Sequence, residues 1–188
     1  MIIWLSGPTG GGKTSISQAL RASGFSIVEE TVPPDLFRSF AADPISNCEA
    51  LQRDIMSARL NGWRAVSRNP RIVFDRSVDE DIEVFCRMHQ GAGLLTDTQV
   101  EALGQFASEI QRELPNPDLI LFISAETDVL LDRLKKAGAP PLIVANLHHQ
   151  LSLYSRWLRD RPEEIVKLDT TRLAARAMAQ LFSEIHSC

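Results

Sequence analysis

The residues best suited to chemistry begin with a glycine-rich segment near the N-terminus. Residues 7–14, GPTGGGKT, match the pattern G-x-x-x-x-G-K-[ST]. Glycines permit backbone angles that turn successive amides toward phosphate oxygens, while the lysine reaches the transferring phosphate. Because a strand is predicted before the segment and a helix after it, a chance glycine-rich turn is disfavoured. The segment predicts a nucleoside triphosphate and Mg²⁺ site made by Gly7, Gly10, Gly11, Gly12, Lys13 and Thr14, with Thr14 as a metal ligand.

Two adjacent acids, Glu29 and Glu30, close an apolar run that predicts a second strand. A carboxylate at this point can accept the proton of a hydroxyl group that attacks a phosphoryl group. An acceptor that carried its own phosphate would favour a cation here, and the next cation is Arg38. The acids therefore favour a neutral acceptor with a hydroxyl group. A solvated acidic turn is the structural alternative.

The tripeptide Asp75-Arg76-Ser77 follows a third apolar run. Asp75 is suited to hold Mg²⁺ through water, and Arg76 can bridge the donor and the acceptor oxygen. Ser77 is also a good N-cap for a helix, and that structural role alone would explain it. Asp81 lies four residues after Ser77, on the same helical face.

A helical stripe of mixed polarity joins Gln52 to Arg59 through Ile55 and Met56. Such a face, polar at both ends and apolar between, suits a flat heterocycle whose edge is read by an amide. The alternative is a surface helix whose apolar stripe belongs to the core.

Alternating strands and helices must position these residues. Strands are predicted at residues 2–6, 25–30, 71–75, 118–124 and 164–169. Helices are predicted at residues 13–21, 47–64, 77–90, 97–113, 126–136, from the 137–141 loop to 158, and 171–186. This order predicts an α/β fold with a parallel five-stranded sheet covered by helices on both faces. Ligands of such sheets bind beyond the carboxyl ends of the strands, where the residues named above cluster.

Composition narrows the class of protein. The 188 residues are 44% hydrophobic and 23% charged, with a formal net charge of −4, which suits one domain spanning 1–188 and disfavours nucleic-acid polymers and acidic membranes as partners. The cysteines, at positions 48, 86 and 188, are scattered as in reduced cytosolic proteins. The apolar N-terminal run lacks the features of a signal peptide, and no segment reaches the length of a membrane span. We expect a cytoplasmic protein.

Taken together, these motifs resemble the deoxynucleoside kinase family, which includes deoxycytidine, deoxyadenosine and deoxyguanosine kinases. GPTGGGKT resembles the family's GxxGxGKS, VEETV resembles its E-P-V strand end, and FDRSVDED resembles its [DE]-R-S-x-x-x-D. The resemblance implies a P-loop NTPase-type fold and ATP-dependent phosphorylation of the 5′-hydroxyl group of a deoxyribonucleoside, with purines slightly favoured. It also implies Mg²⁺ as cofactor and leaves a homodimer open.

The resemblance also implies roles for individual residues. Glu30 stands at the position of the catalytic base, aided by Lys13 and Arg76. LQRDIMSAR resembles the base-reading segment, so that Gln52 and Arg59, with Asp81, would bind the substrate. LFISAETDVLLDRLKK resembles the strand and helix that lead to the lid, and LSLYSRWL resembles the helix after it. Arg133 then stands at the first lid arginine, which contacts the ATP.

The chain departs from the family pattern at the lid, expected around 135–142. The family text R-G-R is replaced by residues 137–139, AGA, so that other cations would have to contact the donor phosphates. Thr31 replaces the usual proline after the base, and no tyrosine stands between Val32 and Gln52 to contact the sugar. Two alternatives stay open: a nucleoside monophosphate kinase of the thymidylate kinase type, and a nucleotide-binding protein without kinase activity. The first would usually place an arginine where this chain has Glu29.

Overall fold

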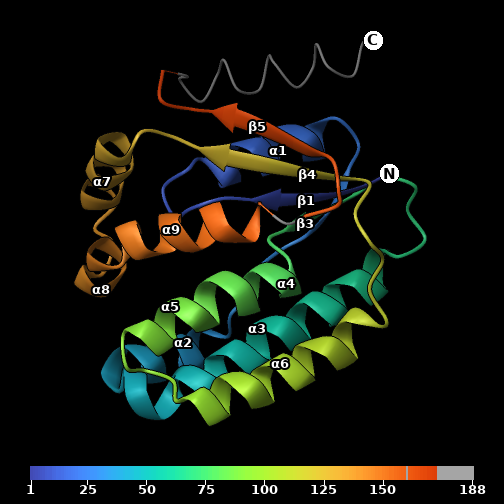
Figure 1. Ribbon diagram of the computed structural model, residues 1–188. Helices are drawn as coiled ribbons and strands as arrows, with labels where there is room; N and C mark the ends of the chain where they lie inside the picture. Colours follow the sequence, from blue (N-terminus) through green and yellow to red (C-terminus); the bar gives the residue numbers. More distant parts are fainter. Residues whose placement is uncertain (160, 173–188) are drawn as a thin grey trace.

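A five-stranded parallel sheet organises the part of the chain that the computed structural model describes, residues 1–159 and 161–172 (Figure 1). Its order is β2-β3-β1-β4-β5. The strands are β1 (Ile2–Ser6), β2 (Ser26–Val28), β3 (Ile72–Asp75), β4 (Leu119–Ser124) and β5 (Ile165–Asp169). The predicted α/β class and parallel five-stranded sheet are therefore confirmed. The first strand occupies the centre, so the phosphate loop that follows it lies at the middle of the carboxyl edge.

Both faces of the sheet are covered, as predicted. Because side chains alternate across a strand, Ile3 and Leu5 of β1 pack on one face and Trp4 packs on the other. The first face carries α1 (Lys13–Ala22), which buries Ile16 and Leu20 there. The opposite face carries α9 (Leu147–Trp157) and the start of a helical layer.

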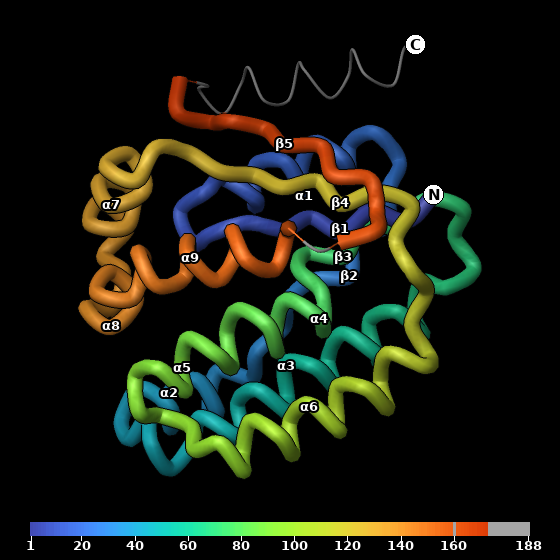
Figure 2. The backbone as a smooth tube through the Cα atoms, in the orientation of Figure 1, coloured from blue at the N-terminus to red at the C-terminus, as the bar shows by residue number. Residues whose placement is uncertain are grey.

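The helical layer lies below the sheet in the view of Figure 1, and Figure 2 traces its path. It contains α2 (Pro34–Ala42), α3 (Pro44–Val66), α4 (Val78–Glu80), a π-helix (Asp81–Cys86), α5 (Arg87–Gly91) and α6 (Asp97–Gln111). Buried apolar side chains of α3, the π-helix and α6 form its own core. The Asp43 carboxylate caps α3 by accepting from the Ser46 amide, and a Thr96–Gln99 capping box starts α6.

Three helices lie between β4 and β5 in the chain: α7 and α8 stand at one edge of the molecule, and α9 runs from them along the sheet (Figure 1). α7 (Thr127–Lys136) is followed by α8 (Pro141–Ala145) and then by α9. Leu130, Leu134 and Leu147 are buried together and hold α7 against α9. The segment 137–140, where the lid was expected, connects α7 to α8.

The predicted boundaries differ from the structure in several places, and the single helix predicted from the 137–141 loop to 158 is two helices, α8 and α9. β2 ends at Val28, so that Glu29 and Glu30 follow the strand instead of ending it. The helix expected from residue 47 begins at Pro44, and the helix expected at 77–90 contains six π-helical residues. α2 was not predicted. The helix predicted at 171–186 lies almost entirely outside the described residues. Within those residues, no helix combines the length and apolarity needed to cross a membrane.

Candidate functional site

The loop between β1 and α1 has the geometry of a phosphate cradle. Gly7, Gly10 and Gly12 adopt φ angles of 139°, 83° and 99°, which side-chain-bearing residues rarely adopt. A Cβ atom on Gly7 would lie 2.0 Å from the carbonyl oxygen of Ile123, so this position also needs glycine for its close approach to β4. α1 begins at Lys13, which places its N-terminal amides at the loop.

The Lys13 ammonium group is folded onto the loop itself. Its Nζ atom donates to the carbonyl oxygens of Gly7 at 2.8 Å and Pro8 at 3.1 Å. Burial, together with the nearby positive charge of Arg76, lowers the pKa of Lys13 to about 7. A bound polyphosphate would supply the negative charge that favours the protonated form.

Three side chains from distant elements hold the outside of the loop. Gln150 of α9 accepts from the Thr9 amide at 3.1 Å, and the Thr170 hydroxyl group donates to the Gly11 carbonyl oxygen at 2.9 Å. The Arg133 guanidinium donates to the Gly10 carbonyl oxygen at 3.2 Å and to the backbone oxygen of Thr170 at 2.7 Å. Arg133 therefore lies against the loop, as expected from its position, but its hydrogen bonds join the loop to the residue after β5. Its contact with a donor stays a prediction.

The Glu30 carboxylate lies at the sheet's carboxyl edge, beyond the end of β2 and beside two buried guanidinium groups. Its Oε2 atom is 3.0 Å from Nε of Arg76 and 3.4 Å from Nη2 of Arg59. Burial alone would raise the pKa of Glu30, but Arg76, Arg59 and Lys13 outweigh it and hold the pKa below its ordinary value. Glu30 is therefore an ionised acceptor at neutral pH, and a third of its side chain is exposed (33%).

Glu29 lines the same cavity as Glu30, but its carboxylate forms an exposed ion pair with Arg21 of α1. The prediction from two adjacent acids therefore reduces to one acid. The second acid matches the structural alternative of a solvated acidic turn.

Two of the predicted substrate residues, Arg59 and Asp81, pair beside Glu30, and Gln52 lies two turns before Arg59 on α3. Arg59 is fully buried and makes a bidentate pair with Asp81, with Nε–Oδ2 and Nη2–Oδ1 distances of 2.6 and 2.9 Å. Burial raises the pKa of Asp81 to about 6, although the Arg59 charge opposes the rise. Gln52 is buried, and its Oε1 atom accepts from the Cys86 thiol at 3.7 Å. Its role in reading a base stays a prediction.

Arg76 has two buried partners, Glu80 and Tyr154, that the sequence analysis did not identify. Among the described residues it is the one non-glycine residue with a positive φ angle, 71°. Its Nη1 atom donates to Glu80 at 2.6 Å and to the Tyr154 hydroxyl oxygen at 2.7 Å. Glu80 stands four residues after Arg76, a helical ion-pair spacing that the sequence already contains. Tyr154 is 78 residues away, and no local signal predicts its contact.

A cavity of about 550 Å³ opens between α1 and the ends of β2 and β3. Thr14, Glu30 and Asp75 line it, with Glu29, Gln18 and Arg21 toward the outside. Oδ1 of Asp75 is buried there and has no hydrogen-bond partner among the described residues. Burial raises the pKa of Asp75 against the opposing charges of Lys13 and Arg76.

These groups fit a magnesium ion. An orphaned carboxylate oxygen and the Thr14 hydroxyl group suit a metal that usually takes one or two protein oxygens, water and substrate phosphates. Within the described residues there is no cluster of three or more His, Cys, Asp or Glu side chains that could cage a metal by itself. The residues therefore match a magnesium ion bound together with a nucleotide.

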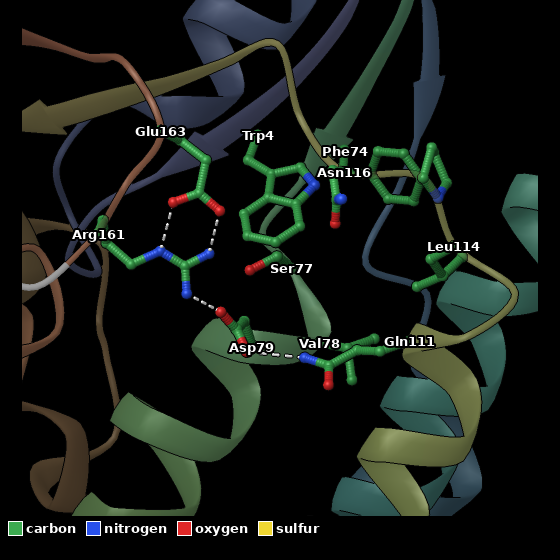
Figure 3. Close-up of a pocket in the computed structure, with 11 residues that line it drawn as sticks. Trp4, Phe74, Ser77, Val78, Asp79, Gln111, Leu114, Asn116, Arg161 and Glu163 are labelled. Carbon is green, nitrogen blue, oxygen red and sulfur yellow. Dashed lines mark hydrogen bonds and ion pairs between the residues drawn. The ribbon is translucent and has the colours of Figure 1, made fainter.

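A second cavity, of about 250 Å³, lies between Trp4 and the loop that precedes β4 (Figure 3). Its charged side chains are paired with one another. Arg161 donates to Glu163 at 3.0 and 2.8 Å and to Asp79, while Gln111 donates to Asp79 at 2.7 Å (Figure 3). None of the predicted site residues lines this cavity, so the candidate site is the one at the phosphate loop.

Comparison with known proteins decides the family. The family model described as "Deoxynucleoside kinase" matches residues 3–179. This chain belongs to the deoxynucleoside kinase family. A deoxyguanosine kinase from Lactobacillus acidophilus is 33% identical to it over 147 residues, which cover 74% of the chain and 64% of that enzyme. The match thus spans less than two thirds of this relative's length.

Solved structures agree with the fold of this deoxynucleoside kinase family member. A deoxyadenosine kinase from M. mycoides with bound dATP matches with a TM-score of 0.80 and 20% identity over the whole of both chains. The same kinase with bound dCTP matches with a TM-score of 0.78 and 20% identity, again over the whole of both chains. At this identity the likeness establishes the fold alone.

Proposed function

We propose that this protein transfers the terminal phosphoryl group of ATP to the 5′-hydroxyl group of a deoxyribonucleoside, with purine deoxyribonucleosides preferred. The family assignment supports the reaction type and disfavours a nucleoside monophosphate kinase. The preference for purines is supported by the identity to a deoxyguanosine kinase. The whole chain, residues 1–188, is proposed to act as one kinase domain, with a short lid around 135–142.

The observation that carries the proposal is the position of Glu30. Its carboxylate lies in the cavity that Thr14 and Asp75 also line, and it is ionised because Arg76 and Arg59 hold its pKa low. An ionised carboxylate beside the phosphate site favours a neutral hydroxyl acceptor over one that carries a phosphate. Glu30 would orient the 5′-hydroxyl group and accept its proton as the new O–P bond forms.

The buried cations would stabilise the negative charge that develops during phosphoryl transfer. The bond between the terminal phosphorus and the oxygen that bridges it to the next phosphate breaks, and ADP leaves with the electron pair. Lys13 and Arg76 would stabilise the charge on the transferring group. Thr14 and Asp75 would hold Mg²⁺, which when bound neutralises phosphate charge and orients the donor.

The acceptor's base would lie in the helical layer against Gln52, Arg59 and Asp81. Arg59 and Asp81 already satisfy each other through two hydrogen bonds, so they form a rigid polar edge. The Gln52 amide offers both a donor and an acceptor, which suits the edge of a heterocycle. Arg133 is proposed to contact the donor in place of the missing lid arginines.

A substrate panel tests the proposal. The purified protein is incubated with ATP and Mg²⁺ and with each of the four deoxyribonucleosides, with thymidylate, or without acceptor, and ADP release is followed in a coupled assay. We expect turnover with at least one deoxyribonucleoside, fastest with a purine, and none with thymidylate. Turnover with thymidylate alone would identify a monophosphate kinase. ATP binding without turnover on any acceptor would identify a binding protein.

A further inference from the structure

The Tyr154 hydroxyl group lies inside the charged centre of the site, although its residue belongs to α9, beyond the proposed lid. It lies 2.7 Å from Nη1 of Arg76 and 2.9 Å from the carbonyl oxygen of Gly7, and it also bonds to Oε1 of Glu80. Tyr154, Arg76 and Glu80 are all buried. One side chain of α9 therefore touches the first residue of the phosphate loop and both members of a buried ion pair.

The hydrogen bonds of this cluster indicate that the Tyr154 hydroxyl group donates its proton to Glu80 and not to the Gly7 carbonyl oxygen. Glu80 is fully buried, and its other oxygen, Oε2, accepts from the Ser6 hydroxyl group at 2.7 Å. A carboxylate accepts a hydrogen bond more strongly than a carbonyl group, so Tyr154 donates to Glu80 and accepts from Arg76. Burial raises the pKa of Tyr154 well above its ordinary value, which keeps the hydroxyl group neutral and able to donate.

These contacts restrain the Arg76 guanidinium on three sides. Nη1 is held by Glu80, Gly7 and Tyr154, Nε faces Glu30 at 3.0 Å, and the Phe85 ring lies 4.4 Å from the guanidinium carbon. The guanidinium is thus fixed in a plane by contacts of Nη1, of Nε and of its flat face.

The same face of α9 also contacts the loop one turn earlier. Gln150 and Tyr154 are four residues apart, and Gln150 accepts from the Thr9 amide. A shift of α9 would therefore move contacts to Gly7, Thr9 and Arg76 together. Since α9 follows α7 and α8 directly, the helices around the proposed lid are joined to the catalytic arginine through this face.

We propose that Tyr154 is a positioning residue for Arg76: with Glu80 it fixes the plane of the guanidinium beside the phosphate loop. This inference rests on the proposed function for its kinetic consequence. Tyr154 acts only through Arg76, so its hydroxyl group contributes to the chemical step and contributes little to nucleoside or ATP binding. Small displacements of a group that stabilises the transition state have large effects on rate.

The variant Tyr154→Phe tests the inference with little change to the core. It keeps the ring that packs 5.4 Å from Phe122 and 6.2 Å from Trp157, measured between centroids. We expect kcat to fall about tenfold, while KM for the nucleoside and Kd for ATP stay within about twofold of wild type. Ser155→Ala, which removes an exposed hydroxyl group from the neighbouring position of α9, is the matched control and should keep wild-type kcat.

A double-mutant cycle separates positioning from a general structural role. If Tyr154 acts through Arg76, adding Tyr154→Phe to Arg76→Lys should change kcat less than twofold, because no guanidinium remains to be oriented. Tyr154→Phe with wild-type kcat, or a further tenfold loss in the Arg76→Lys background, would overturn the inference.

A measurement without turnover keeps the inference testable if the proposed function fails. The Nε–H resonance of Arg76, assigned by its loss in Arg76→Lys, should be sharp in wild type and should broaden or shift in Tyr154→Phe but not in Ser155→Ala. An unchanged resonance would contradict positioning, whatever the substrate panel shows.

Discussion

At the scale of single residues, two adjacent carboxylates show how surroundings decide function. Glu29 is mostly exposed (60%) and pairs with Arg21 at the surface, where an ion pair contributes little. Glu30 faces the buried guanidinium groups of Arg76 and Arg59 in the cavity beside Thr14. The two residues therefore form a natural comparison, because they have the same chemistry and differ in exposure and in ion-pair partners.

We predict that Glu30→Gln abolishes most phosphorylation while ATP binding is kept. The amide has nearly the same shape but cannot accept the hydroxyl proton, so kcat should fall by about 10²- to 10⁴-fold. Glu29→Gln should retain kcat within about twofold, since its partner lies at the surface. Steady-state kinetics and ATP titration measure both variants. Equal activity of the two variants would remove Glu30 from the mechanism.

Residue spacing identified some residues of the candidate site but could not identify the pairs that they form with other elements. Gln52 and Arg59 are buried, and Ile55 and Met56 between them are buried as well, so the apolar part of the stripe belongs to the core, while the reading of a base by this face stays a prediction. The partner of Arg59 is Asp81, 22 residues away, and only the folded chain brings them together. Periodicity finds a face of one helix, but pairs between elements depend on packing.

At the scale of elements, the phosphate loop is held from outside by segments that follow it much later in the chain. Gly7 packs against the backbone of β4 at Ile123, and Thr170 after β5 donates to Gly11. The loop therefore takes its shape from the sheet as well as from its own glycines. The conformation of the loop should therefore depend on Gly7, where a Cβ atom does not fit.

We predict that Gly7→Ala destabilises the protein by roughly 2 kcal/mol or more and weakens ATP binding. The new methyl group would lie 2.0 Å from the Ile123 carbonyl oxygen at a φ of 139°, so loop and strand must separate. Gly104→Ala, on α6, is the control: a Cβ there meets nothing within 4 Å, and alanine should stabilise the helix by about 0.5–1 kcal/mol. Urea unfolding and ATP titration measure both. Equal stability of Gly7→Ala and wild type would contradict the packing argument.

The order and type of most elements could be predicted from sequence, because apolar runs and turn residues mark them locally. All five strands were expected near their observed places, and the parallel order follows from the helices between them. α2 was not predicted, because two successive prolines, Pro33 and Pro34, usually mark a break in regular structure, although proline also suits the first position of a helix. The π-helix at Asp81–Cys86 was missed because no local pattern distinguishes one extra residue per turn.

At the scale of the whole molecule, the site collects cations in a chain of formal net charge −4. The sheet brings Lys13, Arg59 and Arg76 from three separate elements to one edge, where burial removes the screening of water. Glu30, Glu80 and Asp81 offset them. Polyphosphate binding therefore depends on local placement of charge, as expected from the composition.

Burial of a neutral histidine in the helical layer should also link stability to pH. His89 on α5 packs edge-on against Phe40 of α2, with ring centroids 5.8 Å apart. Burial lowers the pKa of His89 from 6.5 to about 4. Between pH 4 and pH 6.5, His89 therefore binds a proton in the unfolded chain but not in the folded protein. The stability that the neutral His89 contributes is present above pH 6.5 and is lost as the pH falls toward 4. Asp81, whose pKa is raised from 3.8 to about 6, acts in the opposite direction between those values.

Because the two groups oppose each other, a comparison of variants is needed to isolate His89. We predict that the free energy of unfolding of wild type relative to His89→Leu falls by about 2 kcal/mol between pH 7 and pH 5, since each unit of pKa difference corresponds to about 1.4 kcal/mol. Urea unfolding at both pH values measures the change. The contribution of Asp81 to the pH dependence cancels because both proteins contain Asp81. His148→Gln, an exposed histidine on α9, should keep the wild-type pH dependence. Parallel pH profiles for wild type and His89→Leu would show that His89 takes up its proton without unfolding, and that α2 and α5 separate locally to admit it.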